Sequence, residues 1–269
     1  PIDRFLDAKI AAAGITPSAP ADKATLLRRA TYVLTGLPPS PAEIASFEAD
    51  VSPEAFAKVV DRLLASPRYG EHFARHWMDL VRYADTHGSE GDPAIPQAWR
   101  YRDYLIRAFN TDVPYDQFVR EQLAGDLLKS PRINAADKLN ESALGTGHFR
   151  MVEHGYQPVD TIDEQVRNVD NQIDVVSKTF LGLTVSCARC HDHKFDAISQ
   201  ADFTAFYGIF ASARPGQVTV DSPALLDQHR DRLSELKQAI RSELSAQWIQ
   251  QAKDLPAALE RIRASSKER

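Results

Sequence analysis

The sequence predicts a mainly α-helical fold with a long, loop-rich middle and a C-terminal helical hairpin or coiled coil. Apolar residues recur at intervals of three and four along most of the chain, which is the spacing of one helix face. Ser, Thr and Asp residues precede several of these stretches, where helices place their N-caps. Strand patterning is confined to residues 217–220, so a large sheet is not expected.

Start and stop signals define the helices of the first third. An apolar stripe over residues 22–37 has Asp22 as its N-cap and stops at a Gly-Leu-Pro-Pro sequence. Two further helices begin at Ser40 and Ser52, because each serine is followed by a proline, whose missing N–H costs nothing at the first helical position. A fourth helix is expected over residues 70–84.

The remaining helices follow a loop-rich middle. Glycines and prolines over residues 85–97 predict a long loop, and helical patterns return over residues 99–110 and 115–123. A capping box of Thr161 and Glu164 predicts a helix over residues 161–182, and aromatic residues on one face predict another over residues 199–213. The leucine-rich tail predicts a long amphipathic helix with a second helix after its proline, at position 256, which gives the hairpin or coiled coil.

Bulk composition narrows the class of protein. The 269 residues are 43% hydrophobic and 26% charged, as in soluble globular proteins. The net charge of −5 argues against nucleic acid as a partner, because surfaces that bind nucleic acid are basic. No run of about 18 apolar residues predicts a transmembrane segment, and residues 1–4 lack the features of a signal peptide. The chain is expected to be soluble and to be a piece of a longer protein.

The two cysteines carry the clearest chemical signal. Cys187 and Cys190 are separated by two residues and followed directly by His191. A disulfide across so short a loop would remove little entropy from the unfolded chain, so stability does not explain the pair. In c-type cytochromes the thiols of C-x-x-C-H bind the haem vinyl groups and the histidine ligates iron. The spacing therefore predicts one covalent haem c.

Two other chemistries use the same residue types. Zinc accepts mixed sulfur and nitrogen ligands, so Cys187, Cys190, His191 and His193 could stabilise a zinc module with a remote ligand. A redox-active thiol pair is a further alternative, although the helix predicted before it does not give the strand-to-helix setting of thioredoxin-like proteins.

The motif and its surroundings resemble the planctomycete cytochrome C domain family, second type, a domain of unknown function. The resemblance starts from residues 187–196 (CARCHDHKFD) and covers approximately residues 1–211. Further blocks similar to the family lie at residues 27–31, 34–39, 61–71, 75–79, 82–85, 101–103, 108–110 and 121–126.

The resemblance implies a c-type cytochrome-like domain within an exported, multi-domain protein. On this basis residues 1–213 are the haem domain, and residues 214–269 are a C-terminal helical extension that starts a linker to another domain. Other redox domains of the same polypeptide, or a redox partner protein, are the expected partners. The expected location is the periplasm or another exported compartment, because haem attachment requires export.

Ligation of the iron by His191 does not determine the sixth iron ligand. A sixth protein ligand is typical of electron carriers, whereas an open sixth position is typical of haem enzymes. His76 is the preferred candidate, because it lies on a predicted helix within a block that resembles the family. His193 is expected to be excluded, since it would have to cross the porphyrin plane. The remaining candidates are Met78, His148, Met151 and His154.

Other polar residues suggest further sites. His72 and His76 are one helical turn apart, a spacing that can chelate a metal. Asp79 and Tyr83 lie on nearly the same face. A glycine-containing loop with three carboxylates could bind calcium. These carboxylates are Asp85, Glu90 and Asp92, and the arginines that could pair with haem propionates are Arg75, Arg82, Arg100 and Arg102.

Electron transfer by a haem with two protein ligands is the favoured function. The alternatives are a haem-dependent oxidative enzyme with an open or displaceable sixth position, and the zinc-stabilised structural module. In the oxidative enzyme the end of the helix over residues 70–84 would supply polar groups to a substrate, namely Asp79, Arg82, Tyr83 and Asp85.

Overall fold

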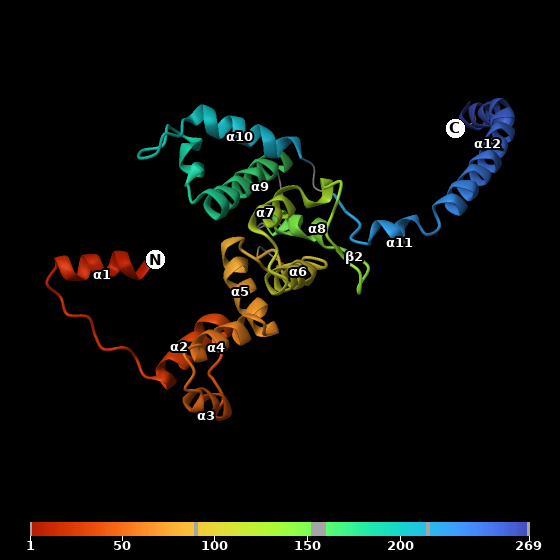
Figure 1. The fold of residues 1–269 in the computed structure, drawn as a ribbon. Coiled ribbons are helices and arrows are strands. Elements are labelled where there is room, and N and C mark those ends of the chain that lie inside the picture. Colours follow the sequence, from red (N-terminus) through yellow and green to blue (C-terminus); the bar gives the residue numbers. More distant parts are fainter. Residues whose placement is uncertain (1, 89–90, 152–159, 214–215, 268–269) are drawn as a thin grey trace. The chain divides into compact units, whose positions relative to one another are not determined.

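The computed structural model describes residues 2–88, 91–151, 160–213 and 216–267 (Figure 1). It confirms the mainly α-helical prediction, because the described residues contain a single sheet, of two short strands. The chain forms two compact units. The first comprises residues 1–131 and 141–218, and the second comprises residues 132–140 and 219–269. A domain boundary after residue 213 stays a prediction.

The first unit contains a helical cluster near its N-terminal end. Helix α2 starts at Asp22, whose carboxylate accepts a hydrogen bond from the Thr25 amide at 2.7 Å, and ends at Gly36 in the left-handed conformation (φ 70°). Leu27 of α2 is fully buried and packs with Phe47 and Leu63. The cluster consists of α2 (Lys23–Thr35), α3 (Pro41–Ala49) and α4 (Ala55–Leu64), and α1 (Ile2–Ala12), which buries no residue, precedes it in the chain.

A buried polar network joins the central helices. Glu121 is fully buried and accepts hydrogen bonds from Tyr104 at 2.8 Å and from Ser142 at 2.9 Å. The hydroxyl of Tyr101 donates to Gln122 at 2.7 Å. Buried polar groups need such partners, so the network fixes one arrangement of these helices. The network joins α6 (Ala98–Asn110), α7 (Tyr115–Ala124) and α8 (Glu141–Leu144). The other helices of this region are α5 (Pro67–Leu80), η1 (Gly125–Leu127) and η2 (Gly145–Arg150).

The last part of the first unit carries the cysteines. Helix α9 (Thr161–Val176) continues into a π-helical turn, η3 (Ser177–Leu181), and stops at Gly182 (φ 66°), as predicted. A 3₁₀ helix, η4 (Val185–Arg189), comes next, and α10 (Gln200–Ser212) runs alongside α9 (Figure 1).

The second unit contains the sheet and the tail. Strands β1 (Ile133–Asn134) and β2 (Leu139–Asn140) form an antiparallel hairpin that the sequence did not signal. Residues 217–220 do not form the expected strand, but the chain pairs with the hairpin at the end of this segment and just beyond it: the carbonyl of Val220 accepts from the Asn140 amide at 2.8 Å, and Asp221 forms an isolated antiparallel bridge with Leu139. The two helices of the tail are α11 (Pro223–Asp227) and α12 (Arg230–Lys267).

The predicted helical hairpin is also wrong. Helix α12 is one element of 38 residues that contains Pro256 in its interior. Proline removes one backbone hydrogen bond and strains the turn before it. A proline can nevertheless kink a helix without ending it, and the flanking residues here are good helix formers, so the helix continues. Its apolar residues, including Leu233, Ile240 and Trp248, are exposed, so the coiled-coil alternative stays a prediction.

Candidate functional site

The motif cysteines lie on a tight turn at the protein surface. Cys187 belongs to η4 and its amide donates to the carbonyl of Thr184 at 3.0 Å, while Cys190 caps the same 3₁₀ helix. Both side chains are exposed and both thiols are free. A short turn that presents two accessible thiols suits covalent attachment of a group that approaches from solvent.

Helix α9 packs against this turn and supports it. Ala188, between the cysteines, is fully buried in a cluster that includes Ile173 of α9 and Phe203 of α10. The hydroxyl of Ser186 donates to Asp174 at 2.6 Å, and Arg189 forms an ion pair with Asp170 at 2.5 Å. The residues between and beside the thiols are therefore held by packing and charge, whereas the thiols remain accessible.

Asp170 and Asp174 differ in their electrostatics. Burial raises the pKa of Asp170, and the positive charge of Arg189 opposes this shift. Burial also acts to raise the pKa of Asp174, but hydrogen bonds from Lys178 and Ser186 outweigh it, so that this pKa is lowered. Sequence reasoning missed both residues, although two carboxylates one helical turn apart share a helix face and could have been noticed.

His191 is exposed and its ring is oriented by the backbone. Its Nδ1 lies 2.7 Å from the carbonyl oxygen of Asp192. A carbonyl only accepts hydrogen bonds, so Nδ1 carries the proton and the lone pair is on Nε2. Metal-ligating histidines commonly donate their other ring nitrogen in this way. The two thiols and Nε2 thus fit a haem c, which the thiols would hold and His191 would ligate.

Both ring nitrogens of His193 have hydrogen-bond partners. Its Nδ1 accepts from the amides of Phe195 and Asp196, at 3.2 and 2.8 Å, and its Nε2 lies 3.0 Å from the hydroxyl of Thr184. With 5% of its side chain exposed, His193 closes the loop after the motif. This role supports the expectation that it does not ligate iron.

The structure places the candidates for the sixth position in different surroundings. His76 is exposed on α5, and its Nε2 lies 3.4 Å from Nε2 of His72. Met78 is half-buried on the same helix, and Met151 is buried. His154 lies outside the described residues. Iron ligation by His76 stays a prediction.

His148 is a core residue. Only 1% of it is exposed, and its Nε2 donates to the carbonyl of Gln122 at 3.0 Å. Within the described part of the chain no hydrogen-bond partner reaches its Nδ1. Burial lowers the pKa of His148 to about 4, and the charge of nearby Arg82 adds to the shift.

Acidification is expected to destabilise the fold through His148. The unfolded state binds a proton near pH 6.5 and the folded state only near pH 4, so stability is lost as pH falls through this window. The loss between pH 7 and pH 5 is about 2 kcal/mol. Urea unfolding at both pH values measures it, and in His148→Gln this difference should shrink. An equally large pH dependence in the variant would contradict the assignment.

Helix α5 ends at Leu80, before the expected residue 84, and the polar residues that follow it are largely used for packing. Arg82, with a positive φ of 54°, donates to Asn171 of α9 at 2.5 Å and to the carbonyl of His148 at 3.2 Å. Burial lowers its pKa to about 10. The hydroxyl of Tyr83 donates to Asp85 at 2.5 Å, and burial raises the pKa of Tyr83 to about 12. Arg82 therefore ties α5 to α9.

The other predicted sites gain little support. Asp92 accepts from the amide of Gly88 at 2.9 Å, while Glu90 lies outside the described residues. Arg102 pairs with Asp103, and Arg100 lies 5.0 Å from the ring of Trp99. Over the described ranges, no group of three or more His, Cys, Asp or Glu residues is placed to hold a metal ion.

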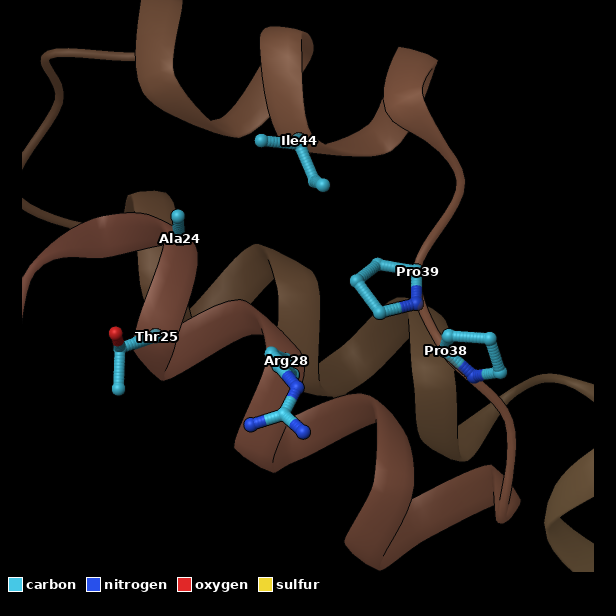
Figure 2. A pocket seen from close by; sticks show the side chains of 6 residues that line it. All are labelled: Ala24, Thr25, Arg28, Pro38, Pro39 and Ile44. Carbon is cyan, nitrogen blue, oxygen red and sulfur yellow. The ribbon is translucent and has the colours of Figure 1, made fainter.

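A pocket of 330 Å³ lies among the first helices, away from the motif residues. Figure 2 shows that Arg28 supplies a positive charge to an otherwise mainly apolar lining from α2, α3 and the loop between them. Its lining contains no residue of the cysteine motif. The lining residues are Ala24, Thr25, Arg28, Pro38, Pro39 and Ile44.

Comparisons with known proteins agree with the resemblance seen in the sequence. Residues 1–215 match the family PSCyt2, described as protein of unknown function (DUF1549). No curated protein and no solved structure matches the chain. Among the described helices, none is both long and apolar enough to cross a membrane. Because the match covers most of the sequence, the chain belongs to the PSCyt2 family, a family of planctomycete cytochrome-like domains of unknown function.

Proposed function

We propose that this domain binds one haem c and transfers electrons as part of an exported, multi-domain protein. Cys187 and Cys190 would hold the haem through thioethers, and Nε2 of His191 would ligate the iron. When bound, the haem supplies a one-electron redox centre. Its partners would be other redox domains of the same polypeptide or a separate redox protein.

This proposal rests on one observation: some residues of the motif offer their side chains to a ligand, whereas others hold the turn in place. The two cysteines and His191 are exposed, and they carry the groups that haem attachment needs; Arg189 is exposed as well. The buried residue of the motif, Ala188, and its ion-paired residue, Arg189, hold the turn against α9. The hydrogen bond from Nδ1 of His191 leaves Nε2 for iron. The site is thus organised around accessible ligands on a fixed support.

A pyridine haemochrome spectrum tests the proposal. The wild type and Cys187→Ala/Cys190→Ala are produced in a host with active cytochrome c maturation. We expect a c-type spectrum in the wild type and its loss in the double variant, because the thioethers cannot form. Ser186→Ala is the matched control, since it changes the same turn but removes no haem ligand. A colourless wild type that contains zinc would instead favour the structural module.

A further inference from the structure

We infer that His72 and His76 form a second metal site, on helix α5, for a divalent transition-metal ion of the zinc, copper or nickel class. The two residues occupy successive turns of one helix, and their Nε2 atoms face each other at 3.4 Å. The site does not depend on the proposed haem.

The separation of the two nitrogens suits a shared ion. Two ligands of a tetrahedral zinc ion, each about 2.0–2.1 Å from the metal, lie about 3.3–3.4 Å apart. A direct N–H···N hydrogen bond prefers a shorter separation, of about 3 Å. The rings are 4.8 Å apart between centroids and nearly perpendicular, at 81°. The 3.4 Å separation lies at the long end for a hydrogen bond between the two rings, and it matches the spacing of two ligands of one ion.

The surroundings of His72 orient it for this role. Its ring is half-buried against the end of α2, with Nδ1 close to Gly36. Gly36 leaves the space for it, since a Cβ there would come within 2.6 Å of Nδ1. With Nδ1 beside the end of α2, Nε2 is directed toward His76. Such outer contacts fix the ring of a metal ligand.

The open side of the site faces solvent. His76 is exposed, so the remaining coordination positions face solvent and would be filled by water or by an oxygen ligand.

Zinc titration by calorimetry tests the site on the full chain. The thiols are first alkylated, which their exposure permits, so that they cannot bind zinc themselves. We expect one zinc ion per chain, with affinity lowered at least about tenfold in His72→Ala and in His76→Ala, the loss that even an outer-shell partner causes. His229→Ala, at another exposed histidine, is the control and should bind as the wild type does.

Three results would overturn the inference. The first is no saturable zinc binding below about 1 mM in the wild type. The second is unchanged affinity in His76→Ala, whose exposed side chain can be removed without unfolding the helix; His72→Gln replaces His72→Ala if the latter fails to fold. The third is a shifted haem spectrum in His76→Ala, which would assign His76 to the iron. A failed haem proposal leaves the zinc titration unaffected.

Discussion

Replacing Glu141 by alanine is expected to lower the free energy of unfolding by about 3 kcal/mol. Its carboxylate is 1% exposed and receives two hydrogen bonds from Arg107, at 2.6 and 3.1 Å. Removing one partner of a buried ion pair costs about 3–5 kcal/mol, because the other charge loses its compensation. Arg107 keeps some contact with water, at 30% exposure, so the lower end of that range is expected. Urea unfolding measures the change.

Glu71→Ala is the matched control for this prediction. Glu71 also pairs with an arginine, Arg68, at 2.8 Å, but both side chains are about half exposed. Exposed ion pairs contribute at most about 1 kcal/mol. If Glu141→Ala were no more destabilising than Glu71→Ala, the buried pair would not hold α8 to α6 as the structure indicates.

Ile173→Ala should lower the free energy of unfolding by about 2–5 kcal/mol, because it leaves a cavity under the cysteine turn. Ile173 is fully buried on α9 and packs in the cluster that contains Val185 and Ala188. Thermal unfolding, followed by circular dichroism, measures the loss. Limited proteolysis should also cut the chain near the motif sooner, since the support of the turn is weakened.

Ile162→Ala, on the same helix, is the control that distinguishes the loss of buried packing from a change in helix propensity. Ile162 is 73% exposed, so the same chemical change there should alter stability by no more than about 0.5 kcal/mol. Similar losses in the two variants would show that Ile173 does not support the turn through packing.

Local signals in the sequence were sufficient for most helices. Asp22 and Ser40 cap their helices as expected, because a cap depends on residues only a few positions away. The cysteine motif was found for the same reason. The caps expected at Ser52 and Thr161 are wrong by one or two residues, since Glu54 and Asp160 hold these positions. The tail shows the limit of this reasoning: a proline predicts a break, whereas α12 continues through Pro256.

Long-range polar contacts could not be predicted. Glu121 and Glu141 are charged residues that sequence patterns place at the surface, yet both are buried, with partners 17–34 positions away in the chain. Likewise, nothing local shows that Arg189 pairs with Asp170 or that His72 packs against Gly36. Such contacts depend on how helices meet, which one sequence does not reveal.

The π-helical turn after α9 changes the phase of that helix. One extra residue per turn rotates the subsequent residues by about 100° relative to a regular α-helix. The preceding part directs Ile173 toward the cysteine turn, and the π turn directs Phe180 toward Trp77 of α5, with ring centroids 5.6 Å apart. A single-residue deletion within 177–181 would restore a regular helix yet put these two faces out of register.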